Sequence, residues 1–504
     1  MISPQTNTET KNLETLGNNQ VSSANIEPIP EILELPEMGD NSAMPEADTK
    51  KLEDQRLFDK FAYEQIEKVQ DYDAVLSKTI SEDTNVKRIL GLACILANTD
   101  EEQRNAILTG PSSVGKTFNM LEVLWFFRNG EQVFELNDAS PKSLIHSANS
   151  TVVDDRTLKP IDMSKQPKKG DQKETWDEWY DLKRHMANYI DLSRKILAVY
   201  DLKDYAFLES IRSLLSHDTK ISTHLIADKS NGANRTKKVL IGGFCTAIFA
   251  SAKLEMDEQE CSRNYLLSPS DNPEKIRQAI ELQARKKTDP EFRKWYETEP
   301  SRLGFKNRMQ QIMEANIKTV LFKKDDMANL KDWFLAKSSV LTPKSQRDFP
   351  RLYAIAEAWA LLNFKFRERT SDGNCIYANA TDIEIAKQIY EPILQCNELG
   401  LTPEEYEVWQ IIEPECNEMM GLRISEIHNI YYYAKKRHCS DKRLREMLKN
   451  FVCAGLLKEE KEGVIIKYYP ITHKETKQSE FSTKVVDLTS TPFLNSNEPS
   501  TGVY

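Results

Sequence analysis

The sequence lacks the features of a membrane, secreted or zinc-ribbon protein. No apolar run approaches the roughly 18 residues that a membrane-spanning helix requires, and no basic-then-apolar signal pattern opens the chain. The eight cysteines are scattered without a C-x-x-C pair, which argues against both a disulfide framework and a zinc ribbon. We therefore expect a soluble, cytoplasmic protein that has no membrane partner.

An excess of positive charge is also absent. The net charge of −10 and the isoelectric point near 5.5 argue against a protein that coats nucleic acid with its whole surface, although they allow a local basic patch. A hydrophobic content of 39% supports a real core. The 504 residues exceed one ordinary domain, and about three units are expected.

The most informative stretch that is present is GPSSVGKT, from Gly110 to Thr117. It follows the apolar run Asn105–Thr109 and precedes a predicted helix from Phe118 to Arg128. A strand before the loop and a helix after it are the context that the pattern G-x-x-x-x-G-K-[ST] requires. We therefore expect this loop to bind ATP or GTP.

Each residue type in the loop has a chemical reason to be there. Gly110 and Gly115 allow the backbone to turn consecutive N–H groups inward, and the loop opens a helix whose N-terminus favours a phosphate. Lys116 is expected to hold the β- and γ-phosphates, and the Thr117 hydroxyl to coordinate Mg²⁺. The predicted phosphate-binding residues are Gly110, Pro111, Ser112, Ser113, Val114, Gly115, Lys116 and Thr117.

Further apolar runs predict the rest of an α/β fold. Glu131–Leu136, Lys195–Asp201 and Val239–Ser251 are expected to be strands that alternate with helices. This alternation around a nucleotide loop predicts a parallel sheet with helices on both faces and its ligand at the carboxyl ends of the strands. The charged residues 151–190 are interpreted as an inserted surface segment, and Pro141–Ser147 as a short helix.

A β-hairpin is expected between the last two strands. Thr219–Ile226 and residues 236–240 flank the basic, glycine-bearing tip Asp228–Arg235. Helices are expected between residues 57 and 97 and through most of residues 276–395. In the second region, the clearest helices are Ala354–Phe366 and Thr381–Tyr390, and the latter opens with a Thr-Asp-Ile-Glu capping pattern.

The last part of the chain has the pattern of a winged helix-turn-helix module. Three amphipathic helices, Thr402–Ile412, Ile424–Lys435 and Ser440–Leu457, precede two short strands within residues 460–469. Leu444, Met447, Leu448 and Phe451 are predicted to face inward. The cations of the third helix are expected to contact DNA phosphates, although winged helices also bind proteins. These cations are Lys442, Arg443, Arg445 and Lys449.

Hydrolysis of a bound nucleotide needs more than a phosphate loop. It requires a carboxylate for Mg²⁺ or water, a polar group near the γ-phosphate and a stabilising arginine. Asp201 follows a predicted strand, and with Thr117 it is a candidate Mg²⁺ ligand, while Ser251 ends the next strand. Arg263 and Arg347 come later in the chain. The candidate catalytic residues are Lys116, Asp201, Ser251, Arg263 and Arg347.

This order of motifs resembles the MCM-like branch of the AAA+ ATPases, which includes the helicase modules of phage and plasmid primase-helicases. The resemblance covers about residues 85–470 and rests on the phosphate loop, residues 195–202, 211–216, 248–253 and 262–267, and on Arg347 with the helix 352–359. It implies that Ser251 is the first sensor, Arg347 the second, and Arg263 the finger that reaches the ATP of a neighbouring subunit.

The resemblance also implies partners. A finger that acts on a neighbour implies a homo-oligomer, a ring of six subunits with ATP between them. The hairpin with Lys229 and Arg235 resembles the one that family members point into the central channel to grip DNA, and the alternative is an exposed charged turn. The sequence contains no primase or zinc domain, so a separate primase would be a partner.

The acidic motif departs from the family pattern, which usually carries two acids after the second strand. Here the row is YDLKD from Tyr200. Either Asp201 takes the metal-binding place and leaves Leu202 where the water-polarising glutamate belongs, or Asp201 replaces that glutamate. Asp204 and Glu209 are candidates to compensate.

The leading hypothesis is a ring-forming ATPase, with ATP and Mg²⁺ as cofactors, that moves along or unwinds DNA in replication of a chromosome or mobile element. The alternatives are an ATP-switched initiator or transcriptional regulator, and a defence or signalling ATPase whose winged helix binds protein. The expected segments are a disordered acidic arm at 1–52, an AAA+ core at 53–275, a helical lid at 276–398, a winged helix-turn-helix at 399–472 and a disordered tail at 473–504.

Overall fold

The computed structural model divides the chain into two compact units, residues 1–50 and residues 51–504, and the second unit contains the elements discussed below. The structure describes residues 46–137, 150–170, 172–202, 206–228, 235–251, 263–338, 341, 343–399, 401–416, 420–436, 438–463 and 465–471. The hairpin tip with Lys229, the helix predicted at Pro141–Ser147, Asp204 and nearly all of both predicted disordered segments lie outside these residues.

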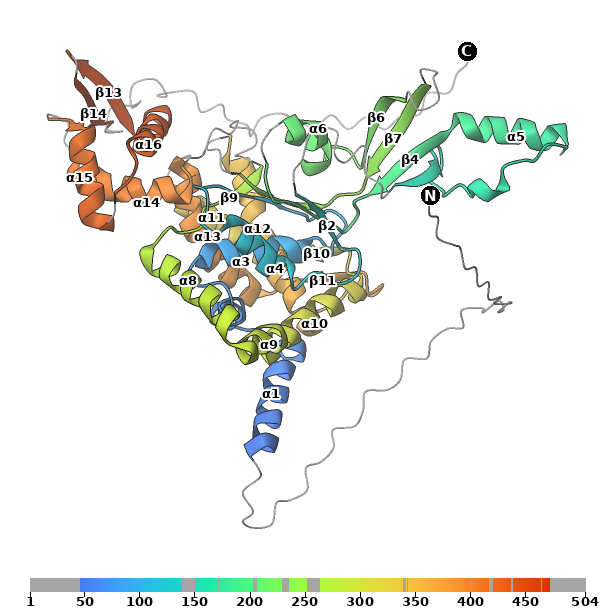
Figure 1. Ribbon diagram of the computed structural model, residues 1–504, viewed down its shortest axis with the longest axis horizontal. Helices are drawn as coiled ribbons and strands as arrows, with labels where there is room; N and C mark the ends of the chain where they lie inside the picture. The colour runs from blue at the N-terminus through green and yellow to red at the C-terminus, as the bar shows by residue number, and fades with distance from the viewer. Residues whose placement is uncertain are drawn as a thin grey trace, which may run out of the picture. The chain divides into compact units, whose positions relative to one another are not determined.

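A five-stranded sheet forms the centre of the second unit (Figure 1). Its strand order is β2-β5-β8-β1-β9, and every neighbouring pair is parallel. β1, β5 and β8 are buried at every position. The strands are β1 (Asn105–Leu108), β2 (Val133–Leu136), β5 (Ile196–Val199), β8 (Thr246–Ala250) and β9 (Asn264–Leu267). The predicted α/β fold with a parallel sheet is confirmed.

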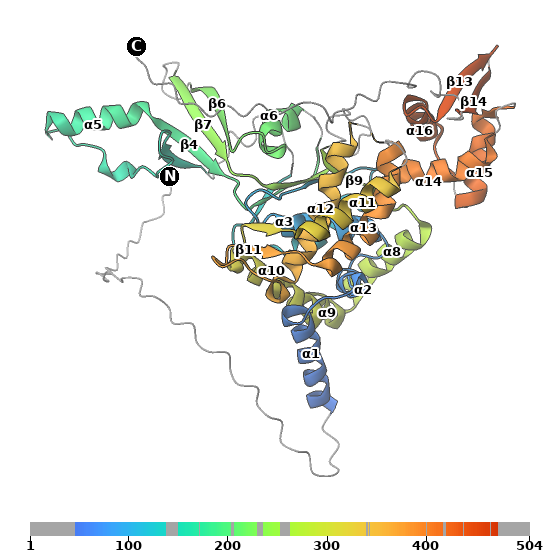
Figure 2. The same cartoon turned by 180° about the vertical axis from the view of Figure 1, so that it is seen from behind.

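Helices cover both faces of this sheet. Neighbouring residues of a strand point to opposite faces, so Ile248 of β8 lies in a core with α3, α4 and α12, whereas Phe249 lies in a core with α6. α12 also packs against α13 on the first side (Figure 2). These helices are α3 (Thr84–Leu96), α4 (Lys116–Leu124), α6 (Ala206–Leu215), α12 (Ser345–Leu362) and α13 (Ala380–Leu399).

A second, four-stranded sheet has the order β3-β4-β7-β6. Its β6–β7 pair is antiparallel, with Asp228 opposite Arg235, as the predicted hairpin requires. Two of its strands, β3 and β4, come from the region that was interpreted as an inserted surface segment, residues 151–190, and these strands were not predicted. The elements are β3 (Thr151–Asp154), η1 (Met163–Lys165), α5 (Lys173–Arg184), β4 (Met186–Asp191), β6 (Ile221–Asp228) and β7 (Arg235–Gly242).

The single strand predicted at Val239–Ser251 is two strands in two different sheets. β7 ends at Gly242 and β8 begins at Thr246. Gly243 between them has a φ of +83°, and a β-carbon there would lie 2.3 Å from the backbone nitrogen of Ser193. Only glycine accepts both conditions, so Gly243 allows the chain to turn from one sheet into the other.

The remaining helices precede β1 or follow β9. α1 begins at Glu46, so residues 46–52, which were predicted to be disordered, are helical. A short parallel pair, β10 with β11, was not predicted. The elements are α1 (Glu46–Tyr63), α2 (Val69–Leu76), α8 (Pro273–Thr288), α9 (Pro290–Thr298), α10 (Pro300–Ala315), β10 (Thr319–Leu321), α11 (Lys324–Lys337), η2 (Phe364–Phe366) and β11 (Cys375–Tyr377). Among the described residues, no helix combines the length and the apolarity that crossing a bilayer requires.

The cap of α13 differs from the prediction. Asn379, not Thr381, begins the helix: its side chain accepts a hydrogen bond from the N–H of Asp382 at 3.1 Å, and Asp382 accepts one from the N–H of Asn379 at 2.9 Å. The reciprocal pattern is a capping box shifted by two residues. Asp382 was taken as an interior residue of the predicted box, and in the structure it is the acid that completes the cap.

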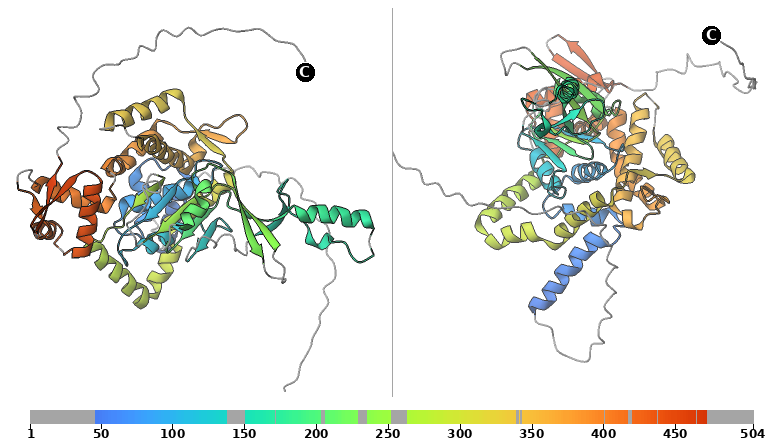
Figure 3. Two further views of the ribbon diagram at one scale, coloured as in Figure 1. Left: turned by 90° about the horizontal axis from the view of Figure 1, so that it is seen from above. Right: turned by 90° about the vertical axis from the view of Figure 1, so that its right-hand side faces the viewer.

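The last part of the chain is a module of three helices and three antiparallel strands (Figure 3). The helix bounds agree with the prediction within a few residues, and Leu444, Met447, Leu448 and Phe451 are buried as expected. The strand β12 was not predicted. The elements are α14 (Pro403–Ile412), η3 (Glu413–Glu415), β12 (Leu422–Arg423), α15 (Ile424–Lys435), α16 (Asp441–Cys453), β13 (Leu457–Glu462) and β14 (Ile465–Pro470).

A buried acid in α12 makes the stability of the fold depend on pH. Burial, and then the charge of Glu102, raises the pKa of Glu357 well above its usual value of 4.5. The pKa of Glu357 is therefore higher in the folded chain than in the unfolded chain. The protonated acid contributes its full stabilisation below its pKa in the unfolded chain, and this contribution is lost as the pH rises toward its pKa in the folded chain.

We therefore expect Glu357→Gln to stabilise the chain at about pH 8 by about 1–3 kcal/mol, because glutamine stays neutral, and to change little near pH 4. Urea unfolding at several pH values measures this difference. A difference that is independent of pH would contradict the argument.

Candidate functional site

The loop between β1 and α4 has the backbone shape that its sequence predicts. Gly110, Ser113 and Gly115 have φ angles of +134°, +68° and +96°. α4 begins directly after Gly115, so the unpaired N–H groups of its first turn lie at the end of the loop. Glycine adopts such angles at little cost, and a helix N-terminus favours an anion. The loop therefore offers backbone donors to a phosphate.

Lys116 lies folded over this loop. Its Nζ donates hydrogen bonds to the carbonyl oxygens of Gly110 at 2.8 Å and Pro111 at 2.7 Å. Burial lowers the pKa of Lys116, and the nearby carboxylate of Asp201 opposes that shift. The structure therefore brings Lys116 and Asp201 close enough to interact, as the predicted site requires.

The carboxyl ends of three neighbouring strands meet beside the loop. The N–H of Ser251 donates to the carbonyl of Leu108 at 2.9 Å, and the N–H of Leu202 donates to the carbonyl of Ala250 at 2.8 Å. These bonds align the ends of β1, β8 and β5, so Asp201 and Ser251 lie at the edge of the sheet where Gly110 begins the loop. Ligands of open parallel sheets bind at this edge.

Asp83 and Lys275 connect the loop and α4 to neighbouring segments, and neither residue was predicted from the sequence. Asp83 is buried and accepts hydrogen bonds from Asn119 of α4 at 2.8 Å and from the N–H of Ser270 at 2.6 Å. Lys275 pairs with Asp83 and donates to the carbonyl of Val114 at 2.9 Å. The one available signal was a lysine in the first turn of α8, where the helix dipole disfavours a cation.

A cavity of about 500 Å³ adjoins the ion pair between Asp83 and Lys275. It is lined by residues 82–86, residues 266–273 and parts of α13, α14 and α15, including Glu404 and Lys435. Asp83 both lines the cavity and holds the loop. A volume in this range accommodates a ligand of nucleotide size.

The structure does not bring Arg263 to the loop of its own chain. Arg263 immediately precedes β9, whose first residue Asn264 pairs with Asn105 at the start of β1. The loop follows the opposite end of β1. Arg263 therefore lies at the amino ends of the strands, and Lys116 lies at their carboxyl ends. Arg347 lies in the first turn of α12 with its side chain exposed.

The four cations predicted to bind DNA in α16 do not share one environment. Lys442 is 89% exposed, Lys449 is exposed, and Arg445 is exposed and pairs with Asp441 at 2.8 Å. Arg443 is only 15% exposed and pairs with Glu404 of α14 at 2.6 Å. The interpretation of Arg443 as a groove-facing residue is therefore corrected.

Arg443 and Glu404 instead lie near the phosphate loop. Both charges act on the pKa of Lys116, in opposite directions. This ion pair belongs to the C-terminal module, and no local sequence pattern predicts its place beside the loop. Of the predicted hairpin residues, Arg235 begins β7, and Lys229 is not among the described residues.

Within the described ranges, no group of three or more His, Cys, Asp or Glu side chains is placed to hold a metal ion. A scan of the sequence against models of known protein families found no match, and a search of curated proteins found none either.

Proposed function

We propose that this chain is an ATPase of the MCM-like AAA+ type that assembles into a ring and uses ATP to move along or unwind DNA. The observation that carries the proposal is the convergence of Lys116, Asp201 and Ser251 at the carboxyl edge of a parallel sheet, next to a loop that offers backbone donors to phosphate. Such a site binds a nucleoside triphosphate and places a carboxylate and a hydroxyl beside it.

Magnesium fits this edge only together with the nucleotide. Thr117 and Asp201 would supply two oxygen ligands, and phosphate oxygens and waters would supply the others that Mg²⁺ prefers. The metal would neutralise charge that develops on the phosphates during hydrolysis.

The position of Arg263 supports a ring. An arginine at the amino ends of the strands cannot reach phosphates bound by the loop of its own chain, which lies at their carboxyl ends. It can face the loop of an adjacent copy in a head-to-tail arrangement. Arg263 is partly buried, and its buried Nη1 has no hydrogen-bond partner among the described residues, which suits it to a partner that completes its hydrogen bonds. ATP would then lie between two subunits.

The C-terminal module supports the DNA part of the proposal. Three helices with a small antiparallel sheet, and exposed Lys442, Arg445 and Lys449 on α16, are the arrangement of a winged helix-turn-helix that meets DNA phosphates. The β6–β7 hairpin, whose predicted tip includes Lys229 and Arg235, is the second candidate contact.

One observation favours the second candidate function, an ATP-switched initiator or regulator. Leu202 is buried in the core with α6, so the residue after Asp201 is neither acidic nor directed at the site. Glu209, a candidate to compensate, lies on α6 with a largely exposed side chain near Arg212. Asp201 is the one acid among the described residues between β5 and α6, and a site with one acid there would hydrolyse ATP slowly.

The test compares phosphate release by the full chain with and without single-stranded DNA. We expect DNA to stimulate turnover, and we expect Arg263→Ala to lower turnover about 100-fold or more while nucleotide affinity stays within about twofold. Arg277→Ala, an exposed arginine on α8, is the control. Slow turnover under both conditions, together with a monomer in sedimentation with ATP and DNA, would favour the switch.

A further inference from the structure

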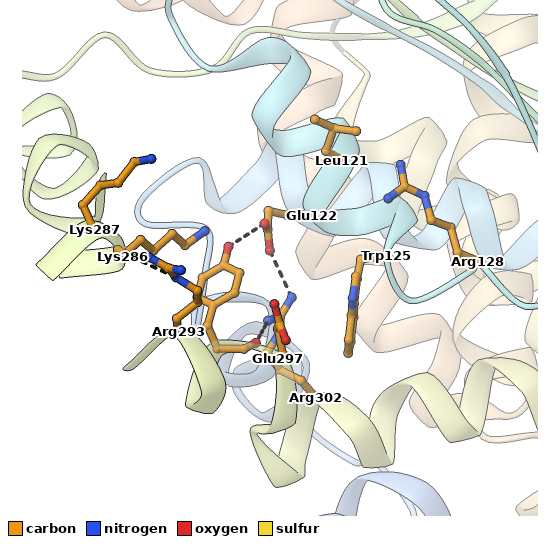
Figure 4. A pocket seen from close by; sticks show the side chains of 10 residues that line it. Leu121, Glu122, Trp125, Arg128, Lys286, Lys287, Arg293, Glu297 and Arg302 are labelled. Carbon is orange, nitrogen blue, oxygen red and sulfur yellow. Dashed lines mark hydrogen bonds and ion pairs between the residues drawn. The ribbon is translucent and has the colours of Figure 1, made fainter. Parts of the chain in front are cut away.

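A second cavity, of about 510 Å³, lies at the end of α4 that is distant from the phosphate loop (Figure 4). α4 and the residues directly after it form one wall, and α8, α9 and α10 form the other. The lining residues are Leu121, Glu122, Trp125, Arg128, Lys286, Lys287, Arg293, Tyr296, Glu297 and Arg302. Neither the ATP site nor the predicted DNA contacts include any of them.

The lining is strongly basic, although the chain as a whole is acidic. Five cations face two carboxylates, which leaves three positive charges around one cavity. Glu122 is already engaged: it accepts hydrogen bonds from the hydroxyl of Tyr296 at 2.5 Å and from Arg302 at 3.0 Å. Its charge is therefore matched within the wall. Arg128 is paired with Glu135, outside the lining, at 2.8 Å, so Lys286, Lys287 and Arg293 share Glu297 as the other carboxylate of the lining.

One wall of the cavity contains a buried arginine, Arg302, that its neighbours hold in place. Arg302 is only 2% exposed, and its guanidinium lies 4.4 Å from the ring centre of Trp125 and 4.9 Å from that of Tyr296. It also donates to the carbonyl of Tyr296 at 2.5 Å, while its buried Nε has no hydrogen-bond partner within the described residues. A cation held this firmly costs little further entropy when it meets an anion.

The cations of the rim come from separate helices and converge on the same space. Lys286 lies 3.4 Å from the ring centre of Tyr296, and Arg293 donates to the carbonyl of Lys286 at 2.6 Å, so α8 and α9 are joined at the rim. Burial lowers the pKa of Lys286, as it does that of Lys306, whose Nζ lies 4.6 Å from the ring centre of Trp125. Like charges gathered in a partly dehydrated space repel one another unless an anion joins them.

We infer that this cavity binds a ligand that carries phosphate groups. Arginine and lysine contacts from three directions match a multiply charged anion with several oxygens, and the arginines can form paired hydrogen bonds with phosphate. Arg302 and Lys306 both lie over the ring of Trp125, at 4.4 and 4.6 Å from its centre, so a base would compete with these cations, and recognition would use the phosphates rather than a stacked base. A nucleotide and the backbone of a nucleic acid both supply this chemistry.

The test uses the full chain that carries Lys116→Ala, so that binding at the loop is weakened. Calorimetry with inorganic pyrophosphate, with ATP and with a short oligothymidine reports binding at the second cavity. We expect the further double substitution Lys286→Glu and Lys287→Glu to weaken binding of at least one probe about tenfold or more. The matched control reverses two lysines of α11, Lys324→Glu and Lys331→Glu, which changes the net charge equally.

The probes distinguish the source of the phosphate. Loss of pyrophosphate and ATP binding identifies a nucleotide site, and loss of oligothymidine binding alone identifies a nucleic-acid contact. The inference is overturned if no probe binds the chain with the intact cavity, or if both double substitutions weaken binding equally. Thermal melting of the two variants separates a loss of binding from a loss of fold.

Discussion

Lys116→Ala is expected to lower the affinity of the chain for ATP about 100-fold or more. The Nζ of Lys116 donates to two loop carbonyls in the structure, and it would exchange these for phosphate oxygens that carry full charges. Truncating one partner of a hydrogen-bonded charge pair costs about 2–5 kcal/mol, and each 1.4 kcal/mol corresponds to about tenfold in affinity.

Stability should change little in this variant, because Lys116 is half-buried and its hydrogen bonds to described residues go to carbonyl oxygens of the loop itself. Calorimetric titration with ATP measures the affinity, and Lys331→Ala on α11 controls for the loss of a positive charge. If Lys116→Ala bound ATP as tightly as the unmodified chain, the loop would not be a phosphate site and the proposed ATPase would be excluded.

Arg367→Leu is expected to destabilise the chain by about 3–5 kcal/mol, a large part of the stability of a typical domain. Arg367 donates two hydrogen bonds to Asp382, at 2.8 and 2.6 Å, and the side chains are 1% and 0% exposed. Leucine would leave the Asp382 carboxylate buried without its cation, while that carboxylate still caps α13.

The pH dependence of this variant identifies the cause. Burial raises the pKa of Asp382, and the hydrogen bonds from Arg367 oppose the shift. Without Arg367 the raised pKa would persist, so the defect should shrink as the pH falls and Asp382 becomes protonated. Urea unfolding at neutral and acidic pH measures this. A defect of equal size at both would indicate lost packing instead.

Two controls accompany the measurement. Adding Asp382→Asn to Arg367→Leu removes the stranded charge and keeps an oxygen for the cap, so the double variant should be more stable than the single one. Lys323→Ala breaks the exposed Lys323–Glu368 pair, whose atoms lie 2.7 Å apart, and should change the unfolding free energy little because water screens both charges.

The parts of the structure that could be predicted are those in which a local pattern determines the result. The phosphate loop needs its glycines and a helix start, and both are written in consecutive residues from Gly110 to Thr117. The buried strand before Asp201 and the inward face of α16 follow from apolar periodicity alone. These elements agree with the structure.

The parts that could not be predicted depend on contacts between distant residues. Asp83 and Lys275 are far apart in the chain, and neither belongs to a motif, yet together they hold the loop. Periodicity also cannot show where a continuous apolar run changes sheets, which is why the turn at Gly243 was missed. The cap of α13 shifted because Asp382 has a second partner, Arg367, that the local pattern does not contain.

The ion pair between Arg443 and Glu404 couples two surfaces of the C-terminal module. Lys442, the neighbour of Arg443 on α16, is in solvent, whereas Arg443 lies near Lys116. While Arg443 and Glu404 stay together, their charges nearly cancel at the phosphate loop. A displacement of α16 that separates them leaves one sign of charge uncompensated there. We therefore predict that a molecule that displaces α16 from its outer side would alter the electrostatic potential at the loop between β1 and α4.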